Sequence, residues 1–288
     1  MTKLIKANFM RIFKNLFFKI CMIFSAGLGI LLDIARYIDI QNNSKYYAGL
    51  GVEYKSADGF VFSGALYLIF AVATFTAIFI GTEYSDGTIR NKLMVGLKRT
   101  EIYIANFVVC TLANIAMLMA FIAVTLGFGY FLFRATSLTA GQTAVYIASQ
   151  CVTMAEFSAI LVLISMLIRS KSGGAVTALI ATILLFVSAI SIAQRLQLPE
   201  YFNQSEAVEN EETGKIEFET VTVKNPRYLM GTQRKIYEQL NNILPVNQFY
   251  QTTNHIDENL GIMAIYSAIV VILSNGIGVV IFQKKDLK

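Results

Sequence analysis

The sequence predicts an all-α polytopic membrane protein with six transmembrane helices, an N-terminal interfacial helix and a small extracellular α+β insert before the last helix. Two observations carry this prediction. Of the 288 residues, 55% are hydrophobic and only 15% are charged, with a mean hydropathy of +0.56, whereas soluble domains carry about 25% charged residues. The apolar residues also gather in six runs of about the 20 residues that a spanning helix needs. This composition excludes an ordinary cytosolic enzyme.

The composition argues against several other classes as well. Although the net charge is +5, the basic residues flank apolar runs and do not form one soluble face, so we expect no binding to nucleic acid. The single histidine, His255, excludes any site that needs two imidazoles. The three cysteines lie in separate apolar runs without the spacing of a zinc site. We therefore expect no catalytic residue, no metal site and no cofactor in this chain.

The six apolar runs divide the chain into segments. They lie near residues 16–38, 61–81, 103–132, 143–168, 175–194 and 261–282. We therefore predict an interfacial segment at 1–15, five spans within 16–194, an insert at 195–259, and the last span with its tail at 260–288. The first run is too long, and its flank too basic, for a cleavable signal peptide.

The distribution of basic residues predicts the orientation in the membrane. Fourteen of the 24 Lys and Arg residues lie in residues 1–19, the loops at 82–101 and 169–174, and the tail. The other connections hold the remaining 10, together with 14 acidic residues. Short loops rich in Lys and Arg stay in the cytoplasm. We therefore expect a multi-pass protein of the bacterial plasma membrane with both termini in the cytoplasm.

Residues 3–15 carry an amphipathic helical pattern. One side of the helix is apolar and the other is basic: Leu4, Ile5, Phe9, Ile12 and Phe13 against Lys3, Lys6, Arg11 and Lys14. Such a helix lies in the membrane interface, where it contacts lipid. The alternative is an unstructured basic flank that only orients the first span.

The insert at 195–259 combines two patterns. Residues 216–223 alternate between apolar and polar, which indicates a strand and one arm of a hairpin. Residues 235–244 follow a helical period that Pro245 interrupts. The segment is too small for a core of its own, so we expect its apolar faces to bury against the membrane helices.

The loop at 82–101 combines a turn signal with a short helix. Asp86 and Gly87 indicate a turn, and Thr88 is suited to cap a helix that begins at Ile89. We expect the basic side chains of this loop to stay in water or to meet an acidic partner: Arg90, Lys92, Lys98 and Arg99. The alternative is a solvated loop that only follows the charge rule for orientation.

This loop resembles that of a known family. The pattern is Glu83, then Gly87-Thr88-Ile89-Arg90, then Leu93, then Lys98-Arg99 and an apolar helix. It is similar to the loop after the second span in permeases of type 2 ATP-binding-cassette (ABC) exporters. The resemblance extends to the six spans and to the apolar segment with Pro245 before the last span. The acidic insert at 200–235 departs from the shortest family members.

The resemblance implies a division of labour between subunits. The loop would form a coupling helix that docks on a cytoplasmic ATPase through Glu83, Gly87, Thr88, Arg90, Lys98 and Arg99. ATP and magnesium would bind that ATPase, since this sequence has no GxxxxGK[ST] loop. A second permease, alike or unlike, would complete the assembly. The substrate would be a peptide, an antibiotic or a lipid-like molecule, with antimicrobial peptide export or resistance as one role.

Polar residues inside the spans form a second candidate set. Gln142, Ser149, Thr153 and Glu156 recur at helical spacing, and a carboxylate at the middle of a span is costly unless it is paired or protonated. This stripe would line a translocation path or hold helices together. In the fifth span, small residues at helical spacing predict a packing face: Thr177, Ala181, Ser188 and Ser191.

Two other functions remain open at this stage. One is a proton-coupled secondary transporter that uses Glu156, although the internal repeats of such transporters are not evident. The other is a membrane receptor or immunity protein, without transport activity, whose insert binds a ligand.

Overall fold

The computed structural model describes residues 1–49, 56–168, 170–209, 216–256 and 258–285. Among these residues, six helical segments are long and apolar enough to cross a membrane, which confirms the predicted fold class. They are α2 (Leu16–Asn42), α4 (Gly64–Ser85) with the short helices η1 (Ala57–Gly59) and η2 (Val61–Ser63) before it, α6 (Arg99–Phe133), α7 (Ala140–Leu167), α8 (Lys171–Gln197) and α11 (Leu260–Lys284).

Helix α4 forms the centre of the bundle. In the most apolar part of the span Ala57–Ser85, which contains α4, 67% of the residues are buried, against 22% in α8 and 28% in both α2 and α11. Asn114 of α6 joins three inner helices, because its amide donates to Thr76 of α4 at 3.1 Å and to Ser158 of α7 at 2.9 Å. Interhelical hydrogen bonds of this kind stabilise membrane bundles. The outer faces of α2, α8 and α11 are apolar and exposed.

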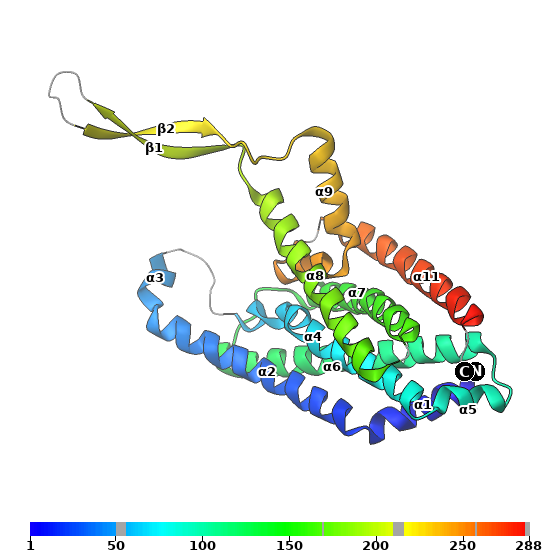
Figure 1. The fold of residues 1–288 in the computed structure, drawn as a ribbon. Helices are drawn as coiled ribbons and strands as arrows, with labels where there is room; N and C mark the ends of the chain where they lie inside the picture. Colours follow the sequence, from blue (N-terminus) through cyan, green and yellow to red (C-terminus); the bar gives the residue numbers. More distant parts are fainter. Residues whose placement is uncertain (50–55, 169, 210–215, 257, 286–288) are drawn as a thin grey trace.

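The N-terminus and the end of α11 lie at one end of the bundle (Figure 1). Helix α1 (Thr2–Lys14) packs on α6, and the amino group of Met1 lies 3.4 Å from Glu101 Oε1. Arg99, at the start of α6, donates to carbonyls at the end of α11. The short helix α5 (Thr88–Met94) lies at the same end.

The connection before α11 extends away from the bundle as a hairpin and returns through two helices (Figure 1). Strands β1 (Tyr201–Glu209) and β2 (Ile216–Lys224) pair antiparallel, with Tyr201 opposite Lys224 and Glu209 opposite Ile216. The strand predicted at 216–223 is confirmed, while its partner strand was not recognised. Helix α9 (Gly231–Ile243) follows, and Pro245 occupies the first turn of α10 (Pro245–Thr253).

Helix α10 is buried among the spans although it lies in the region predicted as an insert. It contacts α7 and α8, and its buried residues include polar ones. Gln248 Nε2 donates to the carbonyl of Asn242 at 2.8 Å, and Gln251 Nε2 to that of Asn241 at 2.7 Å. These bonds satisfy the amides, which is what allows them to be buried. The expected burial of this connection against the membrane helices is thus confirmed for α10.

The packing face of α8 differs from the predicted one. Thr177 and Ser191 are exposed, whereas Gly174, Ala178 and Thr182 are buried. Both sets follow helical spacing and consist of small residues, so the sequence alone did not separate them. The buried set faces α4, with which α8 makes extensive contact.

Candidate functional site

Helix α5 stands between two sharp turns. Gly87 and Gly96 flank it with φ values of +66° and +88°, a backbone conformation that glycine adopts without steric strain. The predicted cap at Thr88 is wrong. The helix begins at Thr88 itself, Gly87 holds the capping position, and no side chain makes a capping hydrogen bond there. The left-handed backbone at Gly87 turns the chain one residue earlier than the polar side chain suggested.

Glu83, near the end of α4, lies at the centre of a buried polar cluster. Its side chain is 0% exposed and forms ion pairs with Arg11 of α1 and Lys92 of α5. Its second carboxylate oxygen accepts a hydrogen bond of 2.7 Å from Asn106 Nδ2 of α6. Asn8 completes the cluster, because it donates to Asn106 at 2.8 Å and accepts from Lys92 at 3.1 Å. Four helices therefore meet at one carboxylate.

The surroundings of this cluster explain how it retains its charges. Arg11 lies over the ring of Phe79, 3.8 Å from its centroid, which adds a cation–π contact. Burial lowers the pKa of Lys92, and the Glu83 carboxylate beside it offsets only part of this effect. Glu83 thus favours the charged form of Lys92. Since removing one member leaves the others buried and unpaired, we infer that the cluster fixes the position of α5.

The other side of α5 faces away from the chain. Ile89 is 2% exposed and packs inward, whereas Arg90 is exposed. Met94 and Val95 are 72% and 83% exposed. A cation next to two large exposed apolar side chains is a combination found at protein interfaces. We call Arg90, Met94 and Val95 the outer face of α5.

Lys98 and Arg99 lie beyond this face and differ from each other. Lys98 is exposed, and its backbone N–H donates to Glu101 Oε2 at 3.2 Å. We predicted that Lys92 and Arg99 would stay in water or meet an acidic partner, and this is wrong for both. Lys92 pairs with Glu83 within the chain, and Arg99 binds the end of α11. Arg99 Nη1 donates to the carbonyls of Phe282 at 3.0 Å and Gln283 at 3.1 Å, and it also contacts that of Lys285. The last carbonyls of a helix lack intrahelical donors, which explains why they attract a cation.

The second candidate set does not form one continuous stripe. Gln142 is exposed and belongs to a capping box with Thr139 at the start of α7, and Ser149 is half-buried. Thr153 and Glu156 are buried against α10 and α11. Thr153 donates to Gln248 Oε1 at 2.8 Å, and Glu156 Oε2 accepts from Ser267 at 2.7 Å. These contacts favour helix packing over a path for Thr153 and Glu156.

A comparison with protein families identifies the chain's family. The model described as "ABC-2 family transporter protein" matches residues 8–287. The chain belongs to the ABC-2 transporter family. No similar curated protein and no similar solved structure was found. The family match makes this ABC-2 chain a permease, which is the membrane component of an ABC transporter and not its ATPase. Membership of this family implies that the chain associates with an ATPase subunit. The assignment favours transport over a receptor or a proton-coupled carrier.

Sequence reasoning missed several residues of this ABC-2 permease. Asn8 was overlooked, although it falls between Leu4 and Ile12 at intervals of four and so shares their buried face. Arg11 was assigned to the water-facing side of α1, which is wrong, because it reaches the Glu83 carboxylate. Met94 and Val95 interrupt a polar loop with exposed apolar side chains, a signal that was readable in the sequence.

Proposed function

We propose that this permease is the membrane-spanning subunit of an ATP-driven exporter in the bacterial plasma membrane. It works with a second permease and with separate ATPase subunits, which bind ATP and magnesium. Its cargo is a peptide, an antibiotic or a lipid-like molecule. Both termini and α5 face the cytoplasm, in agreement with the basic residues of those segments.

The outer face of α5 carries this proposal. The Glu83 cluster fixes the inner side of the helix to α1, α4 and α6, so a force on the outer face reaches three helices at once. Docking buries Met94 and Val95, and Arg90 meets an acidic patch on the ATPase. Movement of the docked ATPase on nucleotide binding is then transmitted through Glu83 to the central helix α4.

Reversal of the charge at Arg90 tests the proposal. In Arg90→Glu, like charges face each other across the interface, so we expect at least tenfold less ATPase to co-purify with the permease. Arg134→Glu is the matched control, because Arg134 is also exposed but lies at the far end of α6. The wild-type complex should also weaken with salt, since rim charges are screened beyond about 8–10 Å. Equal recovery of ATPase with both variants would refute docking through α5.

A further inference from the structure

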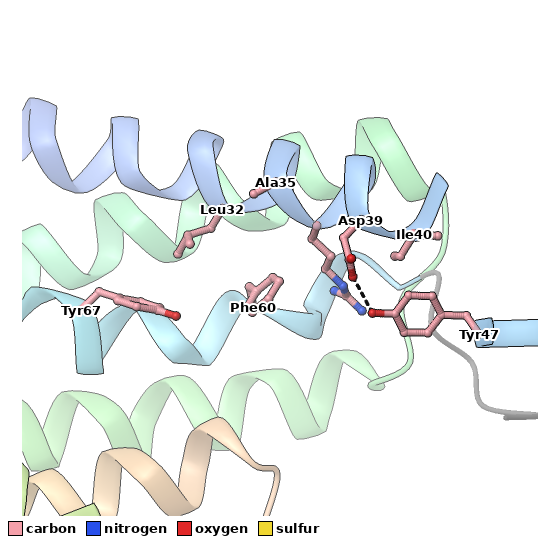
Figure 2. A pocket seen from close by; sticks show the side chains of 8 residues that line it. Leu32, Ala35, Asp39, Ile40, Tyr47, Phe60 and Tyr67 are labelled. Atoms are coloured by element: carbon pink, nitrogen blue, oxygen red, sulfur yellow. Dashed lines mark hydrogen bonds between the residues drawn. The ribbon is translucent and has the colours of Figure 1, made fainter. Parts of the chain in front are cut away.

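A pocket lies at the end of the bundle opposite α5, between α2, α4 and α3 (Ser44–Gly49) (Figures 1 and 2). Its volume is about 350 Å³. It is lined by Leu32, Ala35, Arg36, Asp39, Ile40, Tyr47, Phe60 and Tyr67. Figure 2 shows Asp39 of α2 joined to Tyr47 by a hydrogen bond, with Phe60 in the middle of the pocket and Tyr67 at its other end. The proposed ATPase contact plays no part at this site.

The pocket wall carries one positive and one negative side chain, one turn apart on α2. Arg36 Nη1 donates to the carbonyl of Ser56 at 2.8 Å, and the guanidinium lies 5.4 Å from the ring centroid of Phe60. Asp39 accepts from Tyr47 Oη at 2.5 Å and from Asn43 Nδ2 at 2.7 Å. A carboxylate offers about four acceptor sites. These contacts fix the two charges in place and leave Asp39 with acceptor capacity.

This arrangement matches a ligand that carries both charges. A guanidinium suits a phosphate, and an ammonium group suits a carboxylate beside aromatic ring faces. Asp33 and Asp58 also interact electrostatically with Arg36, so a purely anionic ligand finds no excess of positive charge.

The setting of the pocket adds an apolar requirement. Leu31, Ile34 and Ile38 of α2 are exposed on the same helix that forms the pocket wall. Tyr67, at the rim, is 47% exposed, and tyrosine concentrates at the level of lipid headgroups. A volume of about 350 Å³ is at the small end for ligand pockets. It accommodates a headgroup, while hydrocarbon chains must lie outside it.

We propose that this pocket binds the headgroup of a zwitterionic phospholipid. The phosphate contacts Arg36, the ammonium group contacts Asp39 and the rings of Tyr47 and Tyr67, and the acyl chains lie along the exposed face of α2. The pocket selects for the pair of opposite charges and not for net charge.

Lipid retention by the full-length protein tests this proposal. The protein is purified in detergent with equal amounts of phosphatidylethanolamine and phosphatidylglycerol of identical chains, and bound lipid is counted by native mass spectrometry. We expect wild type to retain phosphatidylethanolamine about tenfold better, the effect of one charged hydrogen bond. Asp39→Asn and Arg36→Gln should each abolish the preference, while Arg134→Gln, a charge loss at the same end of the bundle, should preserve it.

Three outcomes would overturn the proposal. Equal retention of both lipids by wild type contradicts the site. A preference for phosphatidylethanolamine that survives Asp39→Asn also contradicts the site. Asp39→Asn is the deciding variant if Arg36→Gln fails to fold, because Asp39 is exposed and asparagine preserves its shape. Finally, soluble glycerophosphoethanolamine at the lipid concentration should displace nothing. Displacement would indicate a water-borne ligand instead of a lipid.

Discussion

Glu83 holds a negative charge where water does not reach, and its three partners come from three different helices. The sequence identified Glu83 from its place in the loop pattern and placed Lys92 among the basic residues with which it could pair, but it did not identify Arg11 and Asn8 as neighbours. Arg11 looked like a water-facing residue because helical periodicity describes one helix at a time. A pattern within α1 carries no information on a carboxylate that lies 72 positions away in the chain.

Replacement of Glu83 measures the strength of this cluster. Glu83→Gln leaves Arg11 and Lys92 without their buried anion, so we expect a loss of about 3 kcal/mol in the free energy of unfolding. The measurement is the thermal unfolding midpoint in detergent. Glu238→Gln, which breaks an exposed pair with Arg234, should cost no more than about 0.5 kcal/mol. Matching midpoints for the two variants would show that the cluster contributes no stability.

His255 makes stability depend on pH. It packs against Phe62 and Tyr146, with ring centroids 5.7 and 5.6 Å apart. Burial lowers the pKa of His255, and Asp58 offsets only part of this effect. As the pH falls through about 6.5, the usual pKa of histidine, the unfolded chain binds a proton that the folded chain does not, so stability decreases.

The unfolding midpoint at several pH values tests this dependence. We expect the midpoint of wild type to fall between pH 7.5 and 5.5. His255→Asn should lose most of this slope, since the chain has a single histidine, and asparagine tolerates the positive φ of 56° at this position. The same slope in both proteins would assign the pH dependence to other groups.

At the scale of elements, the spans were predictable and their faces were not. Hydropathy describes the free energy of transfer from water into lipid, and a spanning helix enters the lipid as a unit. The apolar runs at 103–132 and 261–282 therefore correspond to α6 and α11 within a few residues. The buried face of α8 depends on a partner helix and was misassigned. Helix α10 lies within the segment predicted as an insert, and the hydrogen bonds of Asn247, Gln248 and Gln251 allow it to be buried among the spans.

The contact of α4 with α8 predicts the effect of a single methyl group. A Cβ at Gly81 would lie 2.7 Å from the Cα of Lys171, and backbone cannot move aside as a side chain can. We expect Gly81→Ala to cost about 1–3 kcal/mol. Gly27→Ala, in α2, meets nothing within 4 Å and should be neutral or stabilising by up to about 1 kcal/mol. The thermal unfolding midpoint is measured for both variants. A midpoint of Gly81→Ala equal to that of wild type would exclude close packing of α4 against α8.

At the scale of the whole molecule, the arrangement of charges predicts its orientation. In a variant without Cys21, Cys110 and Cys151, a cysteine is introduced at Lys98 or at Glu238, both of which are exposed. We expect an impermeant thiol reagent added to intact cells to label position 238 and not position 98, because the basic loop lies in the cytoplasm. Labelling of both positions in opened cells is the control. The reverse pattern in intact cells would invert the topology.

The account as a whole rests on the claim that the outer face of α5 binds the ATPase. The most direct measurement is site-specific photo-crosslinking in native membranes, with a photoreactive residue at Val95 or Met94 and, as the control, at Ile272, which is equally exposed on α11. We expect crosslinks from positions 94 and 95 to a protein with a nucleotide-binding motif, and none to it from position 272. Crosslinks to that protein from position 272 alone, or to lipid from all three positions, would contradict the claim.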